Sequence, residues 1–239
     1  MTAGSGRPTL LAVAHGTRVA AGAATMEALL TRVRALGPGL RVERCFLDLA
    51  RPALPEALAR LRGEVVLVPL LLGTGYHHRV DIPAALAAAP HLRARLARPL
   101  GPHPLLAAAL ADRLHAAGWR ARVPRSALVL AAAGSTDPAA GADTAAMAAL
   151  LREHLPGSPP VVPANLCGAG PTPTEAVAAL RAAGHRQVAV AGYLLSPGFF
   201  ARRAAASGAC LTSAPLGSHD ALARLVVLRY QEALLSPAL

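Results

Sequence analysis

Two histidines, His15 and His77, stand in polar loops that follow apolar segments of the chain. His15 comes straight after TLLAVA, residues 9–14, and His77 lies in the glycine-rich stretch GTGYHHRVDIP, residues 73–83. A neutral imidazole binds divalent transition metals, and it also accepts or donates a proton near pH 7. Metal binding, proton transfer and ordinary polar contacts in a loop are therefore the three alternatives for this pair.

Alternating strand-like and helix-like segments must position these histidines. Short buried runs predict strands, and longer periodic segments predict helices between them. The predicted strands are residues 9–14, 41–49, 64–71 and 92–100, and the predicted helices are 20–36, 52–62 and 104–118. This alternation predicts a parallel sheet with helices on both faces, that is, an α/β fold.

The two histidines are expected to meet at one edge of that sheet. Ligands bind at the carboxyl ends of strands in open α/β sheets, and the first and third strands are neighbours in the usual doubly wound order. His15 follows the first strand and His77 the third. Two imidazoles facing a cleft suit Fe, Co, Ni or Zn, and so few protein ligands favour a metal in transit over a structural one.

The second half of the chain repeats the order of the first. Four pairs of segments match: SALVLAAAGST (126–136) with TLLAVAHGT (9–17), PTPTEAVAAL (171–180) with PALPEALARL (52–61), VAVAGYLLSPGFFARR (188–203) with VVLVPLLLGTGYHHRV (65–80), and APLGSH (214–219) with RPLGPH (98–103). A spacing of about 118 residues between matches indicates an internal duplication. We predict two similar α/β domains, residues 1–119 and 120–239, joined by a hinge at 120–125.

The duplication allows the histidines to be compared with their counterparts. Glycines of the two loops persist in both halves, whereas His15 aligns with Ala133 and His77 with Phe200. If the histidines held the loops in shape, both halves would need them. Their joint loss from one half indicates a shared task that is carried out once per molecule.

The formal charge of +11 does not indicate a nucleic-acid-binding protein. All 24 basic residues are arginine, a bias typical of a GC-rich genome, and aromatic residues make up only 3%. Single-strand binders need basic grooves interleaved with aromatic side chains, which this sequence lacks. Attraction of a small polyanionic ligand stays open as a use for the positive charge.

Cysteine spacing and hydropathy restrict the class of protein further. Cys45, Cys167 and Cys210 are far apart and form no CxxC pair, so we expect buried, reduced thiols. The amino terminus MTAGSGRPTL has no signal-peptide core, and no apolar run approaches the ~18 residues of a membrane-spanning helix. We therefore expect a soluble cytoplasmic protein.

Three motifs together resemble the sirohydrochlorin chelatase family. They are HGTR after the first predicted strand, FLDLARP after the second and VPLLLGTGYHHRVDIP after the third. The family comprises class II chelatases of the small cobaltochelatase and ferrochelatase type, and the resemblance covers nearly the whole chain. Its most specific part, H-x-x-x-D-I-P, selects His77 over His78. The resemblance implies two flavodoxin-like domains across a cleft and ATP-independent insertion of a divalent metal into sirohydrochlorin.

The resemblance also implies roles for individual residues. His15 and His77 would bind the metal and catalyse its insertion. Substrate-binding residues would be Arg18, Gly73, Thr74, Gly75, Tyr76, Arg79, Ser135 and Phe200. The macrocycle carries many carboxylates, and arginine binds carboxylates well, so Arg202 and Arg203 are further expected contacts across the cleft.

The expected metal is a substrate, and no organic cofactor is expected. Fe²⁺ is favoured because sirohaem is the more widespread product, with Co²⁺ for cobalamin biosynthesis or Ni²⁺ as alternatives. The expected partner is the tetrapyrrole sirohydrochlorin, with no nucleic acid and no membrane. The protein would be a lyase that acts as a monomer or a homodimer.

Several neighbouring residues receive more ordinary interpretations. His78 is expected to support its neighbour or to face solvent, and His103 and His219 recur in both halves, which favours a structural role at a helix start. Asp81 is interpreted as a helix N-cap, with a link to His77 as the less favoured alternative. The pair Phe199 and Phe200 is either an apolar wall of the cleft or part of the core. The role of Asp48 stays open.

Two other classes of function compete with the chelatase. A non-catalytic tetrapyrrole or metal carrier could use the same cleft without accelerating metal insertion. A phosphate-handling enzyme is loosely suggested by a histidine followed by glycine and arginine, but Ala14 stands where such an enzyme needs arginine. A nucleotide-binding module is disfavoured, since neither GxGxxG nor a Walker pattern is present.

Overall fold

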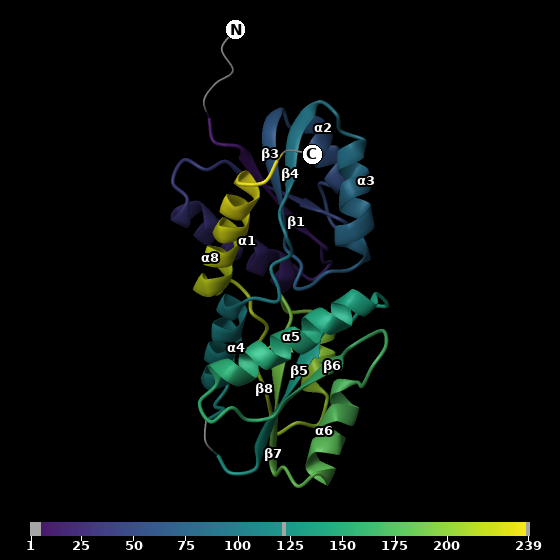
Figure 1. The fold of residues 1–239 in the computed structure, drawn as a ribbon, viewed down its shortest axis with the longest axis vertical. Helices are drawn as coiled ribbons and strands as arrows, with labels where there is room; N and C mark the ends of the chain where they lie inside the picture. Colours follow the sequence, from purple (N-terminus) through teal and green to yellow (C-terminus); the bar gives the residue numbers. More distant parts are fainter. Residues whose placement is uncertain (1–5, 121–122, 238–239) are drawn as a thin grey trace.

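Two four-stranded parallel sheets, one from each half of the chain, form the framework of the molecule (Figure 1). The computed structural model describes residues 6–120 and 123–237. The first half contains β1 (Thr9–Ala14), α1 (Ala20–Leu36), β2 (Val42–Phe46), α2 (Leu54–Arg60), β3 (Gly63–Pro69), the π-helical turn η1 (His77–Asp81), α3 (Ile82–Ala87), β4 (Leu92–Leu96) and α4 (Pro104–Ala116). The second half contains β5 (Ser126–Ala132), α5 (Pro138–His154), β6 (Val161–Asn165), α6 (Pro173–Ala182), β7 (Gln187–Tyr193), α7 (Phe199–Ala205), β8 (Leu211–Thr212) and α8 (Asp220–Leu234).

The two sheets have the same strand order. The first is β2-β1-β3-β4 and the second is β6-β5-β7-β8, with every pair parallel. The central strands β1 and β5 are buried along their whole length, as expected for apolar strands covered on both faces. These observations confirm the predicted fold of two similar α/β domains.

Strand register brings the loops after β1 and β3 together. Val13 pairs with Pro69, and Ala14 pairs with Phe46 on the other side. The segments that leave β1 and β3 therefore start side by side at the carboxyl edge of the first sheet. His15 and His77 lie on these segments, as the sequence predicted.

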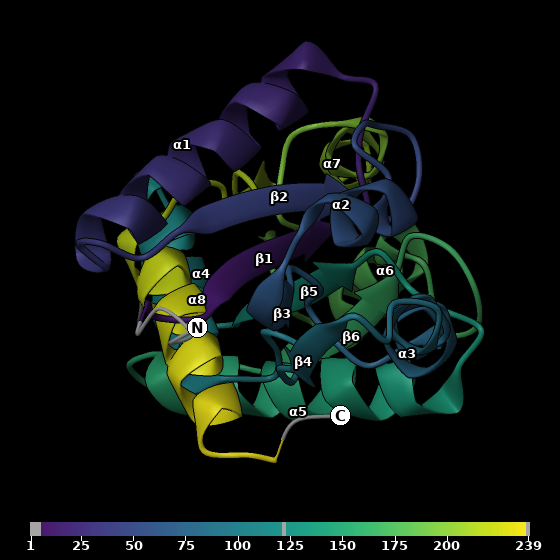
Figure 2. The same ribbon diagram turned by 90° about the horizontal axis from the view of Figure 1, so that it is seen from above.

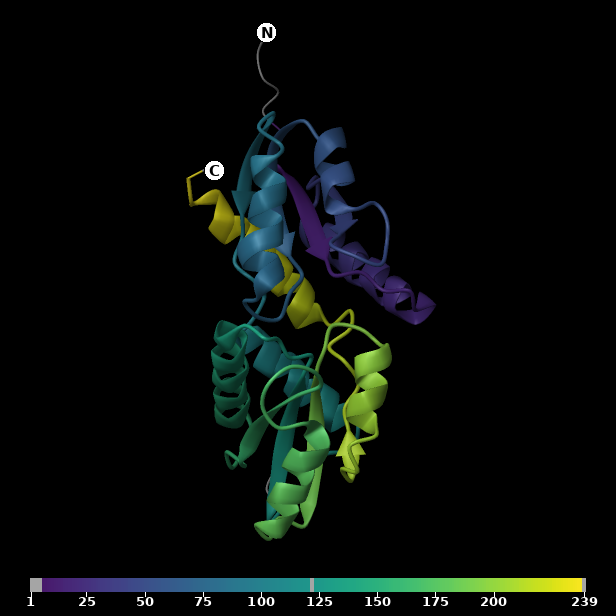
Figure 3. The same ribbon diagram turned by 90° about the vertical axis from the view of Figure 1, so that its right-hand side faces the viewer.

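Each half of the chain contributes its last helix to the sheet of the other half. Helix α4 packs against α5 and β7, whereas α8 packs against α1, β3 and β4. Figures 1 and 3 show α8, in yellow, beside the first-half sheet and α4 beside the second-half sheet. Figure 2 shows α1 and α8 on one face of the first sheet and α2 and α3 on the other. The division of the chain into 1–119 and 120–239 stays a prediction, and residues 121–122 of the predicted hinge lie outside the described residues.

The chain crosses between the two sheets at residues 97–103 and 213–219, which we call the first and second crossover segments. They contain the repeated sequences LGPH and LGSH. His103 Nδ1 accepts a hydrogen bond from Leu105 N, and His219 Nδ1 accepts one from Ala221 N, each at 3.1 Å. Both histidines therefore cap the exchanged helices, which confirms the structural role predicted for them.

The exchanged helices join the two halves through one continuous apolar core. It contains buried residues of both central strands and of both exchanged helices, among them Leu10, Leu106, Leu128 and Leu225. Each sheet also has one smaller apolar core on its outer face. Because protein interiors are close-packed, a shared core holds the carboxyl ends of the two sheets at a defined separation.

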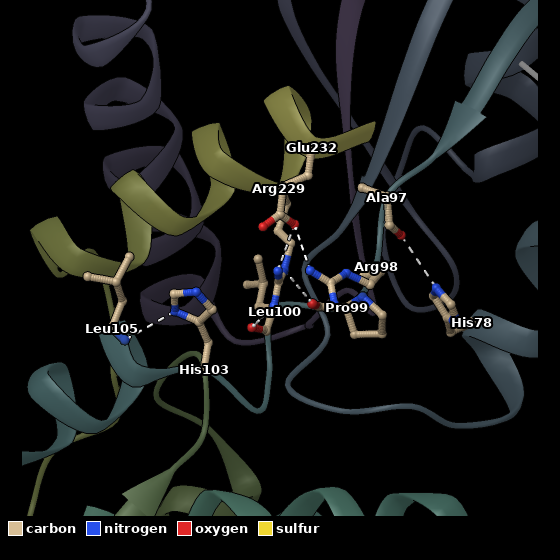
Figure 4. Close-up of polar contacts among 9 residues, drawn as sticks. All are labelled: His78, Ala97, Arg98, Pro99, Leu100, His103, Leu105, Arg229 and Glu232. Carbon is tan, nitrogen blue, oxygen red and sulfur yellow. Dashed lines mark hydrogen bonds and ion pairs between the residues drawn. The ribbon is translucent and has the colours of Figure 1, made fainter. Parts of the chain in front are cut away.

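A buried arginine on α8 binds the first crossover segment. Arg229 is 4% exposed; its Nε donates to Pro99 O at 2.8 Å and its Nη2 to Leu100 O at 3.1 Å. Its Nη1 donates to Glu232 at 2.8 Å, and Glu232 also accepts from Arg98 at 3.2 Å (Figure 4). The exchanged helix is therefore held to the crossover by hydrogen bonds as well as by apolar packing.

Helix boundaries follow local signals in the sequence. Helix α6 begins after Thr172, whose hydroxyl accepts from Glu175 N while the Glu175 carboxylate accepts from Thr172 N at 2.8 Å. Helix α1 ends before the predicted Gly-Pro-Gly break that starts at Gly37.

Among residues 6–120 and 123–237, no helix combines the length and the apolar character needed to cross a membrane.

Candidate active site

The carboxyl ends of strands from both sheets surround one cavity of about 790 Å³. Its walls include the residues at or just after the ends of β1, β2 and β3 on one side and of β5, β6 and β7 on the other: Ala14, Phe46, Leu70, Ala132, Asn165 and Leu194. A cavity between two α/β units, at the carboxyl ends of their strands, is the usual place for a ligand in such folds.

His15 and His77 face each other on the first-half side of this cavity. Their ring centroids are 5.1 Å apart, and the ring planes are inclined by 42°. Gly16 lets the chain turn directly after His15: it has φ +99°, and a side chain there would overlap the carbonyl oxygen of Asp48. The adjacency predicted from the strand order is confirmed. In the described part of the chain, the two rings belong to no group of three or more His, Cys, Asp or Glu side chains that could hold a metal.

Asp81 binds the ring of His77 and does not cap a helix. His77 Nδ1 lies 2.6 Å from Asp81 Oδ2. The predicted N-cap is wrong, because Asp81 has helical angles, φ −66° and ψ −45°, and η1 continues through it into α3. An ionised carboxylate can only accept hydrogen bonds, so Nδ1 is the nitrogen that carries the proton when the ring is neutral. Nε2 is then the unprotonated nitrogen, available to a metal or to a proton.

The surroundings of His15 favour its neutral form. Partial burial against the cavity wall lowers the pKa of His15, and the neighbouring His77 lowers it further, while the carboxylate of Asp48 acts in the opposite direction. With the pKa below its ordinary value, the His15 ring is uncharged at neutral pH. It can therefore bind a metal or accept a proton without first losing one.

His78 points away from the cavity. Its Nε2 lies 3.4 Å from the carbonyl oxygen of Ala97, at the start of the first crossover segment (Figure 4). Burial lowers the pKa of His78, partly offset by that hydrogen bond and by the charge of Asp143. Of the two adjacent histidines, His77 lines the cavity with His15, in agreement with the motif that selected it.

Eight of the ten predicted site residues line the cavity. They are His15, Gly73, Thr74, Gly75, Tyr76, His77, Ser135 and Phe200. Arg18 is exposed outside the lining, and Arg79 instead pairs with Asp137 of the second half at 3.2 Å. The chemical roles of all ten residues stay predictions.

The two arginines expected on the far side of the cleft do not line the cavity either. Arg203 donates to Leu166 O at 2.6 Å and lies over the ring of Phe199, 5.7 Å from its centroid. Arg202 is exposed on the same helix, α7. The cavity wall is therefore mainly apolar, and the arginines stand around it.

Phe199 and Phe200 form an aromatic corner on the second-half side. Their rings meet edge to face with centroids 5.5 Å apart, and both line the cavity. Phe199 is 60% exposed, whereas Phe200 also packs against the core of the second sheet. Both interpretations of this pair therefore apply. Phe199 and Phe200 form part of the cavity wall, and Phe200 also packs against the core.

Some lining residues were not predicted. Leu49, in a left-handed conformation with φ +57°, and Met26 add apolar surface to the wall.

Cys167 also lines the cavity, and both Cys167 and Cys210 are exposed. The prediction of buried thiols is therefore wrong for these two residues and confirmed for Cys45. Burial raises the pKa of Cys45 to about 12, which keeps it an inert thiol. The repeat could have located Cys167, because it follows β6 as Asp48 follows β2.

Comparison with known proteins places both halves in one family. The CbiX family model matches residues 9–117 and again residues 127–233, which confirms the internal duplication. A sirohydrochlorin cobaltochelatase of Priestia megaterium is 28% identical over 206 residues, covering 82% of this chain and 66% of that protein, slightly less than two thirds of its length. A sirohydrochlorin ferrochelatase of the same organism is 28% identical over 197 residues, covering 79% of this chain and 73% of that protein.

The fold is also that of a solved chelatase structure. SirB from Bacillus subtilis with Fe³⁺ superimposes with a TM-score of 0.79 at 24% identity, and the match covers 96% of each chain. At this level of identity the likeness establishes the architecture.

Proposed function

The chain belongs to the CbiX family of sirohydrochlorin chelatases, and from this premise we propose that it inserts a divalent metal into sirohydrochlorin without ATP. The observation that carries the proposal is the pair of facing imidazoles, 5.1 Å apart, on the wall of the cavity between the halves. The second half has no histidine at the equivalent positions, so the molecule has one such pair per chain. The product would serve sirohaem or cobalamin biosynthesis.

The cavity suits a flat macrocycle with an apolar face. Its volume of about 790 Å³ lies in the range of small-molecule sites, roughly 300–1,000 Å³. Phe199, Tyr76 and Leu49 expose apolar surface at the cavity, and Arg18 and Arg202 stand outside it. In the proposed complex the aromatic residues contact the ring and the outer arginines contact its carboxylates.

The two histidines would divide the work of metal insertion. The metal must lose its water ligands, and two pyrrole N–H protons must leave the macrocycle. His77, with Nδ1 held by Asp81, offers Nε2 to the incoming metal. His15, neutral at pH 7 because of its lowered pKa, accepts one pyrrole proton or shares the metal, and any pyrrole proton that His15 does not accept passes to solvent water. The metal is a substrate here, carried from solvent to the macrocycle.

Fe²⁺ is the proposed physiological metal and Co²⁺ the alternative. Two imidazoles form a borderline ligand set that suits both ions, and metal availability commonly decides between them. The two Priestia megaterium relatives are named for cobalt and for iron, at the same identity to this chain. Competition between the metals on the purified protein is therefore part of the experiment.

The proposal is tested by following the visible spectrum of anaerobic sirohydrochlorin with Fe²⁺ or Co²⁺, with and without the protein. The protein should accelerate metal insertion, and His15→Ala and His77→Ala should each remove most of the acceleration, on the order of 100-fold. His78→Ala is the matched control, since this neighbouring ring points away from the cavity. Binding of sirohydrochlorin without acceleration would overturn the enzyme and support the tetrapyrrole carrier instead.

A further inference from the structure

The loop that carries His77 is held in place by side chains of the second half. We call residues 72–81 the histidine loop. Tyr193 Oη donates to Leu72 O at 2.6 Å, and Thr74 N donates to Asp143 Oδ2 at 2.5 Å. Within residues 6–120 and 123–237, these are the hydrogen bonds that residues 72–74 make. The start of the loop therefore takes its hydrogen-bonded support from α5 and β7 of the second half.

Asp143 is the central contact of this support. It lies on α5, which packs against α4 and against β5 and β6 of the second sheet. A Cβ added at Gly73 would come 3.2 Å from Asp143 Oδ2, so the loop backbone packs closely on the carboxylate. No ion pair involves Asp143 in the described part of the chain. Its bond to Thr74 N is a charge-assisted one, stronger than a neutral amide contact.

Tyr193 supports the loop from the end of β7. Its side chain is 3% exposed, and its hydroxyl is the hydrogen-bonding group that reaches across to the first half. Burial, and then the charge of Asp143, raise the pKa of Tyr193 above its usual range. The hydroxyl therefore stays protonated at neutral pH and donates to Leu72 O.

The far end of the histidine loop also contacts a side chain of the second half. Arg79 Nη1 lies 3.2 Å from Asp137 Oδ2, and Asp137 also caps α5 by accepting from Ala139 N at 2.9 Å. The second half thus contacts the loop at its start, at Thr74 and at Arg79, two residues beyond His77. The position of the His77 ring relative to His15 depends on this whole segment.

We propose that Asp143 and Tyr193 are positioning residues for His77: the second half, which has no histidine at the positions equivalent to His15 and His77, holds the histidine loop so that His77 faces His15. This inference rests on the proposed metal-insertion function and assigns a task to the duplicated half. Neither residue has to touch the reacting atoms. They act through the loop backbone, and misplacement of a catalytic group by about 1 Å can cost on the order of 100-fold in rate.

The test compares Asp143→Ala, Asp143→Asn and Tyr193→Phe with the wild-type chain. We expect Asp143→Ala to lower kcat for metal insertion about 10-fold to 100-fold with little change in KM for sirohydrochlorin. Asp143→Asn should recover part of the rate, because the amide oxygen still accepts from Thr74 N. Tyr193→Phe keeps the buried ring and removes only the hydroxyl, so it tests the second contact without a large cavity. Glu153→Ala, an exposed carboxylate on the same helix, is the control and should behave as wild type.

Co²⁺ binding to the protein alone separates this inference from the chelatase proposal. Visible absorption of bound Co²⁺ reports the imidazole ligands and requires no turnover. We expect Asp143→Ala to weaken Co²⁺ binding several-fold and to alter the spectrum, whereas Glu153→Ala does neither. If the wild type binds Co²⁺ but inserts no metal, the chelatase proposal fails while the positioning inference is still decided by these spectra. Unchanged kcat and Co²⁺ binding in Asp143→Ala and Tyr193→Phe would overturn the inference.

Discussion

Arg113 and Arg229 occupy equivalent positions on the two exchanged helices, and each binds the crossover segment that leads to the other helix. Each arginine stands ten residues after the histidine that caps its helix. Arg113 Nε and Nη2 donate to Leu216 O at 3.2 and 2.8 Å, and Arg229 Nη2 donates to Leu100 O at 3.1 Å. The duplication has therefore kept a pair of reciprocal contacts that fasten the exchange of helices.

We predict that Arg229→Met destabilises the protein more than Arg113→Met does. Arg229 is almost completely buried and bonds Pro99, Leu100 and Glu232, so its removal leaves two carbonyl oxygens without their donor. Arg113 is half-buried and bonds one carbonyl oxygen. Hydrogen bonds from charged groups contribute ~1.5–3 kcal/mol each, so about 3 kcal/mol is expected for Arg229→Met and about half of that for Arg113→Met. Urea unfolding measures both, and equal losses would contradict the difference in burial.

Glu232 forms ion pairs with Arg98 of the first crossover segment and with Arg229 of α8. These ion pairs should give the protein a contribution to stability that is lost in acid. Burial raises the pKa of Glu232, but the hydrogen bonds and charges of Arg229 and Arg98 lower it more, and the net pKa lies below its ordinary value of 4.5. A depressed carboxyl pKa stabilises the folded state above about pH 4.5, and this contribution is lost as pH falls through the folded-state pKa.

Between pH 7 and pH 3, the free energy of unfolding of Glu232→Gln should therefore fall less than that of wild type. Glu153→Gln is the matched control, since Glu153 is exposed and forms no ion pair in the described residues. Identical pH dependence in wild type and Glu232→Gln would contradict the assignment.

Gly101→Ala should disturb the contact between Tyr193 and the histidine loop. A side chain at this position of the first crossover segment would overlap both the Tyr193 hydroxyl and the carbonyl oxygen of Leu72. Forcing extra atoms into a close-packed region costs about 1–3 kcal/mol, and Tyr193 or the loop must move. Thermal unfolding should show this loss of stability. The metal-insertion assay should show lower activity.

Gly141→Ala, in contrast, should stabilise the protein. Gly141 lies within α5, and nothing lies within 4 Å of a Cβ added there. In a helix interior, alanine is favoured over glycine by roughly 0.5–1 kcal/mol, so this variant should be more stable than wild type. A stabilising Gly101→Ala would show that the crossover is less tightly packed than the structure indicates.

Thiol labelling should report whether the tetrapyrrole enters the cavity. Cys167 and Cys210 are exposed and Cys45 is buried, so a maleimide should modify the first two in the folded protein and all three after unfolding. Cys167 lines the cavity, whereas Cys210 does not. Sirohydrochlorin should slow labelling of Cys167 about tenfold at saturation and leave Cys210 unchanged. Peptide mass spectrometry distinguishes the sites, and equal protection of both would argue against binding in this cavity.

Local patterns in the sequence predicted much of the framework. The helix at 20–36 has the predicted bounds, and the strands lie within or close to the predicted ranges. The strand order and the meeting of His15 with His77 followed from the doubly wound topology, because neighbouring parallel strands end at the same edge. The repeat also identified His103 and His219 as structural residues, since a residue kept in both halves serves a need that both halves share.

What only the tertiary structure decided is which surfaces meet across the two halves. An amphipathic pattern specifies that one face of α4 or α8 is buried, but it is the same pattern whichever sheet covers that face, so the exchange of helices was invisible in the sequence. The bond of Asp81 to His77 depended on the π-helical turn, a backbone geometry without a strong sequence signal. The contacts of Asp143 and Tyr193 with the histidine loop depend on the separation of the two sheets, which the packing of the shared core sets.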